Sequence, residues 1–138
     1  MRKSSFLLLL ATLFLGLFCT PASADPAADA RAVVQGFYDR YAKVKDPEPW
    51  VKKSTQVTPA FKQAYTAFMK KDADSDPIIA GQDSPEGGYH VSEVAVKGDH
   101  ATVTMSSKEK GFTKPIKVQV IQVKGAWLIN GVNELRGK

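Results

Sequence analysis

A run of four aspartates has the spacing of a calcium-binding loop and is the first candidate for chemistry. Carboxylate oxygens at positions one, three, five and twelve ligate calcium in EF-hand loops. Position six is Pro77, where the sharp turn needs glycine, and an aspartate at position twelve reaches less far than glutamate. We therefore predict that these side chains shape turns and cap helix ends, and that no metal is bound. The candidate metal loop consists of Asp72, Asp74, Asp76 and Asp83.

A second polar group follows directly, at Gln82, Asp83 and Ser84. It could form a site at the mouth of a pocket, where Asp83 would need a partner to supply or remove a proton. His90 and His100 are the only histidines in the chain, and His100 is predicted to face solvent at a hairpin turn. Since no Ser–His–Asp set can be assembled, no catalytic residue is assigned.

Aromatic residues form the third group. Their spacing places most of them in the core, but in a pocket their rings and hydroxyls would form the lining. The sequence has no glycine-rich phosphate loop, no histidine pair at metal-ligand spacing and no cofactor motif, so no cofactor is predicted. The candidate ligand-binding residues are Tyr38, Tyr41, Gln82, Asp83 and Trp127.

The N-terminal segment 1–24 has the three parts of a secretory signal peptide. Two basic residues precede an unbroken run of apolar, glycine or threonine residues at 6–18. Ala22 and Ala24 are the small residues that a signal peptidase accepts. We predict cleavage between Ala24 and Asp25, which would place the protein in the periplasm or outside the cell.

Two other fates of this segment compete with cleavage. A retained membrane helix is disfavoured because the apolar run rises only about 20 Å, against a hydrocarbon core of ~30 Å. A lipid anchor on Cys19 is disfavoured because bulky Phe18 stands where lipid attachment needs a small residue. We therefore expect no stable membrane insertion after cleavage.

The net charge of the chain limits the kinds of binding partner that we expect. The chain has 138 residues, with 19 Lys and Arg against 14 Asp and Glu. Because Arg2 and Lys3 lie in the predicted signal peptide, residues 25–138 keep a net charge of only +3. This mild excess does not predict nucleic acid or an anionic membrane as partner. The single cysteine, Cys19, would be removed as well, which excludes thiol chemistry and disulfides from the mature chain.

Two helices are predicted at the start of the mature chain. Asp25-Pro26 supplies an N-cap and a first helical residue, and apolar residues then recur every three or four positions to about Lys45. The prolines of the segment 46–49 should end this helix. Thr58-Pro59 repeats the start signal for a second helix that ends near Lys71.

After the second predicted helix, the spacing of apolar residues changes to the alternation that is typical of strands. Residues 89–97 and 100–107 should form a hairpin that turns at Gly98-Asp99. This turn sets the register, so that Val94 faces Val103 and Met105 continues the same apolar face.

A second hairpin, of 115–124 and 126–133, should turn near Gly125. Its apolar residues depart from simple alternation. Either a bulge or a strand covered on both faces explains the departure, or the sheet is curved around a pocket or forms a homodimer.

Together these elements predict one α+β domain over residues 25–138. Two N-terminal helices should pack on one face of a curved four-stranded antiparallel sheet. The pattern Asp74-x-Asp76-Pro77 followed by Gln82-Asp83, with Gly36-Phe37-Tyr38 before it and 125–129 after it, resembles the small exported bacterial family called domain of unknown function 3828. This resemblance covers roughly 28–133 and implies a cystatin-like, or nuclear-transport-factor-two-like, fold.

The resemblance implies no activity, because that family has none assigned, and the superfold includes isomerases, dehydratases and binding modules. We therefore predict a non-enzymatic exported domain that binds a small ligand or an envelope protein. One alternative is an inhibitor or immunity-type partner of another envelope or secreted protein. The other is a small enzyme with a polar pocket near Gln82 and Asp83.

Overall fold

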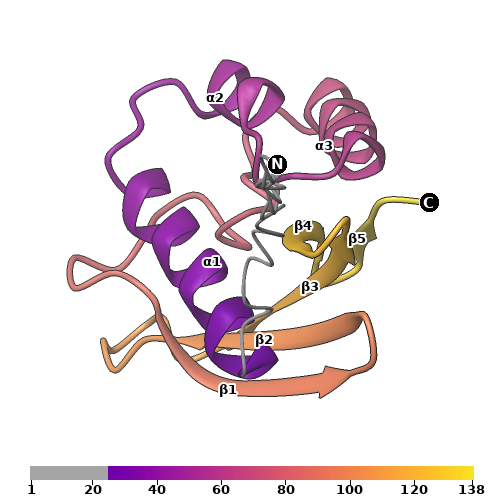
Figure 1. Cartoon of the computed structure of the whole chain (residues 1–138). Helices are drawn as coiled ribbons and strands as arrows, with labels where there is room; N and C mark the ends of the chain where they lie inside the picture. Colours follow the sequence, from indigo (N-terminus) through magenta and orange to yellow (C-terminus); the bar gives the residue numbers. More distant parts are fainter. Residues whose placement is uncertain (1–24) are drawn as a thin grey trace, which may run out of the picture.

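The computed structural model describes residues 25–138, and the predicted signal peptide with Ala24 lies outside them. Three helices precede a five-stranded antiparallel sheet whose strands follow chain order (Figure 1). The domain is therefore α+β, as predicted, with one more helix and one more strand than expected. The elements are α1 Pro26–Tyr41, α2 Pro47–Lys53, α3 Pro59–Lys71, β1 His90–Lys97, β2 His100–Ser106, β3 Ile116–Val123, β4 Ala126–Val132 and β5 Leu135–Arg136.

Helix α1 begins as the sequence predicts and ends earlier. The Asp25 carboxylate accepts hydrogen bonds from the N–H groups of Ala27 and Ala28, which caps the helix. The predicted end near Lys45 is wrong, because the chain tightens after Tyr41. There the N–H of Val44 donates to the carbonyl three residues back, at Tyr41, as in a 3₁₀ turn.

Helix α2 was not predicted, since the prolines of 46–49 were expected only to end the preceding helix. Pro47 is the first residue of α2, and Pro49 also lies in its first turn, where a missing N–H costs no intrahelical bond. The short helix buries Val51 and places Trp50 against Phe37 of α1, with ring centroids 5.1 Å apart.

Helix α3 matches its prediction at both ends. Thr58 caps it by accepting a hydrogen bond from the N–H of Phe61 at 3.1 Å, and its own hydroxyl donates to Asn130 Oδ1 at 2.6 Å. The cap therefore also ties the start of α3 to β4. Phe61 and Tyr65 are fully buried on the inner face of the helix.

The first hairpin has the predicted register. Val94 pairs with Val103, and the turn residue Gly98 has φ +61°. A β-bulge between Val91 and Glu93 brings Val91 opposite Met105, so the apolar face continues to the end of β2.

The second hairpin contains a bulge, which was one of the two predicted explanations for its pattern. Gln119 pairs with Gly131 whereas Val120 pairs with Ile129, which leaves Asn130 as the extra residue of β4. The bulge lets both Ile129 and Val132 reach the core.

Strand β5 was absent from the predicted four-stranded sheet. It has only two residues and pairs with the end of β4. A Cβ at Gly131 would lie 2.5 Å from Gln119 Oε1 and 3.1 Å from the Leu135 carbonyl oxygen. Glycine at this position therefore allows the close approach of β5.

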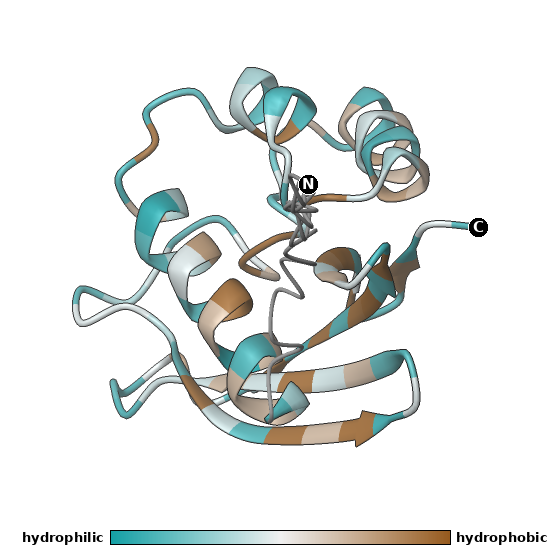
Figure 2. Cartoon of the chain, in the orientation of Figure 1, coloured by the Kyte–Doolittle hydropathy of each residue, from teal (hydrophilic) through white to brown (hydrophobic). Residues whose placement is uncertain are grey.

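One core joins the helices to the sheet. Figure 1 shows α1 across the concave side of the sheet and α3 beside β5. Along the strands apolar residues alternate with hydrophilic ones (Figure 2), as expected for a sheet with one buried face. Val103, Met105, Val118 and Ile129 are fully buried on that face.

Candidate functional site

Of the four aspartates of the candidate metal loop, Asp76 is the one whose side chain is turned toward the protein interior. Its Oδ2 accepts a hydrogen bond from the Tyr41 hydroxyl at 2.5 Å, and its Oδ1 accepts one from the N–H of Ile78 at 2.9 Å. The side chain is half-buried, whereas Asp72, Asp74 and Asp83 are exposed. Asp76 therefore anchors the loop to α1.

Two further contacts fix the same loop. The N–H and carbonyl of Asp76 both bond to Gly81, with N···O distances of 2.8 and 3.2 Å. The Tyr38 hydroxyl donates to the Ile78 carbonyl at 2.7 Å, and Ile78 is fully buried. The loop is therefore fixed by two tyrosine side chains of α1 and by backbone hydrogen bonds within the loop itself.

Burial is the main cause of the pKa shifts of Asp76, Tyr41 and Tyr65. Burial raises the pKa of the Asp76 carboxyl, while the hydrogen bonds from Tyr41 and from the backbone act in the opposite direction. Burial, and then the hydrogen bond to Asp76, raise the pKa of Tyr41. Burial also raises the pKa of Tyr65 to about 12. The phenols therefore keep their protons near neutral pH, which leaves Tyr41 as a donor and Asp76 as its acceptor.

The four aspartates of the candidate metal loop are not gathered into one site. Within residues 25–138, no group of three or more His, Cys, Asp or Glu side chains is arranged to hold a metal ion. Pro77, which replaces the expected glycine, is buried. The one inward carboxylate, on Asp76, already accepts hydrogen bonds through both of its oxygens.

Millimolar calcium should therefore leave the melting temperature of the protein unchanged. A calcium site occupied at a hundred times its dissociation constant would add about 2.7 kcal/mol to the free energy of unfolding, which corresponds to a shift of several degrees. Thermal unfolding with calcium and with EDTA measures this directly. Stabilisation by calcium that disappears in Asp74→Asn would contradict the prediction.

Gln82 and Asp83 lie at a polar groove of about 410 Å³ beside this loop. We call it the loop groove, and its other wall comes from the β2–β3 connection. The two predicted residues are exposed there, near Lys114. The groove is lined by Ile79, Ala80, Gly81, Gln82, Asp83, Tyr89, Gly111, Phe112 and Lys114.

Neither histidine lines the loop groove. His90 Nε2 lies 3.0 Å from the Gly87 carbonyl oxygen. His100 is exposed at its hairpin turn, as predicted, with Nδ1 2.6 Å from a carboxylate oxygen of Asp99. The structure thus brings Gln82 and Asp83 together without placing an imidazole beside them.

The three aromatic residues predicted as candidate ligand contacts lie in the core. Tyr38, Tyr41 and Trp127 are 4–5% exposed, and none of them lines the loop groove. Tyr41 stacks on Phe37 with ring centroids 5.8 Å apart. Tyr38 meets Tyr89 edge to face at 6.2 Å, so it supports the groove from behind. Their positions agree with the alternative that the sequence spacing favoured, a role in packing.

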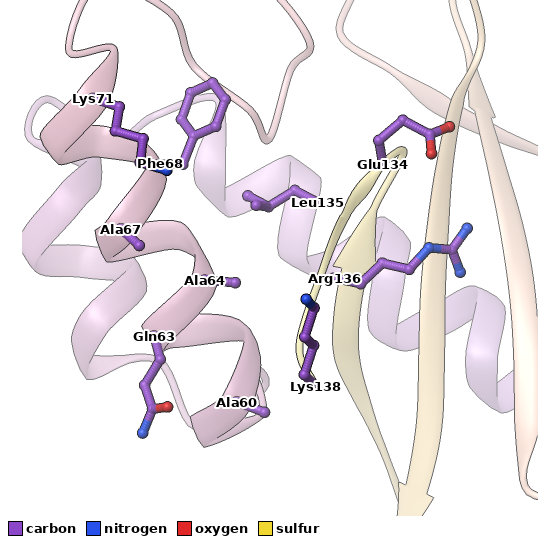
Figure 3. A pocket seen from close by; sticks show the side chains of 10 residues that line it. All are labelled: Ala60, Gln63, Ala64, Ala67, Phe68, Lys71, Glu134, Leu135, Arg136 and Lys138. Carbon is purple, nitrogen blue, oxygen red and sulfur yellow. The ribbon is translucent and has the colours of Figure 1, made fainter.

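A second groove was missed by sequence reasoning. It lies between α3 and β5, has a volume of about 530 Å³, and is called here the α3–β5 groove. Figure 3 shows Ala60, Ala64 and Ala67 directed toward β5, and Leu135 directed toward the helix. Lys71 and Lys138 lie near the two ends of this surface, whereas the side chains of Glu134 and Arg136 extend away from α3 (Figure 3). The full lining is Ala60, Gln63, Ala64, Ala67, Phe68, Lys71, Glu134, Leu135, Arg136 and Lys138.

The sequence contains a pattern that indicates one wall of the α3–β5 groove. Ala60, Ala64 and Ala67 recur at helical spacing, on a face of α3 different from that of the buried Phe61 and Tyr65. Alanine is also a strong helix former, so the pattern is easily read as propensity alone. The opposite wall depends on β5, which is too short to show a strand period.

No helix within residues 25–138 combines the length and apolar character needed to cross a membrane. Comparison with known protein families finds no matching family model, and comparisons with curated proteins and with solved structures find no match either.

Proposed function

We propose that this protein is an exported, periplasmic domain that binds a small ligand and is not an enzyme. The observation that carries the proposal is the α3–β5 groove. Its volume of about 530 Å³ falls within the range of about 300–1,000 Å³ that is usual for small-molecule sites. Its walls are a helix and a strand, which hold a binding surface more precisely than loops do.

The side chains around the groove favour binding over catalysis. Its lining contains no histidine, cysteine, serine, threonine or tyrosine. A hydroxyl or thiol nucleophile activated by an imidazole therefore has no residues from which to form there. Apolar wall residues with a few polar groups at the edge are typical of a binding site.

Heteronuclear NMR of the 25–138 domain, titrated with a set of small apolar and amphipathic compounds, tests this function. We expect amide shifts concentrated in α3 and β5. The variant Ala64→Trp should fill the groove and remove these shifts. The matched control is Ala32→Trp, since Ala32 is an exposed alanine on α1 outside the groove. Shifts that survive Ala64→Trp, or no shifts with any compound, would overturn the proposal.

The alternatives from the sequence predict different results. An inhibitor or immunity-type protein would retain a specific protein from envelope extract, and that capture would survive Ala64→Trp. An enzyme at the loop groove would respond to Asp83→Asn, because Asp83 is the carboxylate at that groove. We also propose a cystatin-like or nuclear-transport-factor-two-like placement of the fold, supported by helices followed by a curved antiparallel meander.

The predicted export of the protein can be tested separately. Mass spectrometry of the protein produced in a Gram-negative host should give a mature N-terminus at Asp25, in the periplasmic fraction. Asp25 caps α1 through its side chain, so the residue that follows the predicted cleavage point already has a structural role. Acylated Cys19, or intact Met1 in the cytoplasm, would contradict this result.

A further inference from the structure

The charged side chains that line the α3–β5 groove are mostly basic. Helix α3 contains Lys62, Lys70 and Lys71 and no acidic residue. Lys71, Arg136 and Lys138 line the groove, against a single carboxylate on Glu134. Within residues 25–138, none of these four side chains forms an ion pair. A ligand that complements this site therefore carries negative charge.

The groove has a definite length and one end where its walls meet. A Cβ on Gly137 would lie 2.7 Å from the backbone nitrogen of Phe61, so the chain after β5 packs directly against the start of α3. From Ala60 to Lys71 the helix rises about 16 Å. Figure 3 shows Phe68 and Lys71 at the end of α3 opposite Ala60. An apolar wall thus extends from the contact at Gly137, which is followed by Lys138, toward Lys71 at the other end.

We propose, on the basis of the binding function above, that the α3–β5 groove binds the anion of a free long-chain carboxylic acid. The alkyl chain lies along Ala60, Ala64 and Ala67 and packs against Leu135. The carboxylate lies at Lys71. Such a ligand matches both features of the groove, because it removes apolar surface from water and brings one negative charge to an unpaired ammonium group.

Two other anionic partners fit the groove less well. An extended peptide that adds to a sheet edge needs a run of free backbone groups, but β5 has only two residues. A membrane surface would contact protruding apolar side chains, whereas Ala60, Ala64 and Ala67 line a recess. A single linear chain is therefore the occupant that the groove favours.

A chain-length series tests the proposal. Saturated carboxylates of increasing length, below their micelle concentrations, are titrated into the 25–138 domain and followed by NMR or calorimetry. Affinity should rise about two- to fourfold with each added methylene. The increase should stop when the chain exceeds about 16 Å, the length of the wall. A trimethylammonium compound with the same alkyl chain should bind on the order of tenfold more weakly.

Neighbouring lysines provide a matched pair of variants. Lys71→Gln should weaken carboxylate binding about two- to fivefold, as expected for an exposed charge pair, and the loss should shrink at high salt. Lys70→Gln removes the same charge from the next residue, which does not line the groove, and should change affinity by less than its neighbour. Ala64→Trp should abolish binding of every ligand in the series.

Each other outcome overturns the proposal in a recognisable way. Equal affinity for the carboxylate and the trimethylammonium compound, with no effect of Lys71→Gln, would reject the anion while leaving a binding groove. Binding to anionic vesicles but not to the free carboxylates would assign the groove to membrane lipid. Tighter binding of an acidic peptide, blocked by Ala64→Trp, would assign it to a protein. No binding of any compound would reject the proposed function itself.

Discussion

The variant Val103→Asp should fail to fold. Val103 is fully buried in β2, where it pairs with Val94 of β1 and Val118 of β3. Both paired side chains are apolar, so the new carboxylate would have no partner beside it. Burying an unpaired charge costs several kcal/mol, against a total stability of about 5–15 kcal/mol for a domain. Circular dichroism and thermal unfolding of the purified variant measure the effect.

The adjacent residue supplies the control for this experiment. Thr102 precedes Val103 in the same strand, points to the opposite face of the sheet and is only partly buried. Thr102→Asp should therefore fold, with a loss of about 1 kcal/mol or less. A wild-type melting curve for Val103→Asp would show that this face of β2 is not in the core.

Asp76→Ala should destabilise the domain by about 2–4 kcal/mol and lower its melting temperature on the order of 10 °C. The substitution removes the acceptor of both the Tyr41 hydroxyl and the Ile78 N–H. Tyr41 is buried, so its hydroxyl would lose a partner that water cannot replace without opening the loop. Tyr41→Phe removes one of the two bonds and should cost less. Equal stability of Asp76→Ala and wild type would contradict the role of Asp76 as an anchor.

The pH dependence of the same residue has a definite sign. Burial raises the pKa of Asp76 in the folded protein above its value in the unfolded chain. The part of the stability that depends on protonation of Asp76 is therefore fully present below about pH 4 and is lost as the pH rises through the folded pKa, whereas the hydrogen bonds to its oxygens remain. Asp76→Asn removes this titration, so its stability relative to wild type should increase with pH in that range. Asp74→Asn, at an exposed position of the same loop, is the control.

Much of the fold follows from local sequence signals. Asp25 and Thr58 mark helix starts because their side chains bond to free N–H groups within three residues. The Gly98-Asp99 turn determines the register of the first hairpin because a two-residue loop leaves one pairing. The alternation of apolar residues then determines which face of β2 is buried. These features need no information from distant parts of the chain.

The candidate sites depend on contacts that no local pattern contains. Asp76 meets Tyr41 across 35 positions of the sequence, so its spacing from the other aspartates does not reveal that it is an anchor. The α3–β5 groove depends on β5, whose two residues form a strand only because β4 lies beside them and Gly131 allows their approach. Helix propensity explains the alanines of α3, but only the packing of Gly137 against the start of that helix turns them into the wall of a groove.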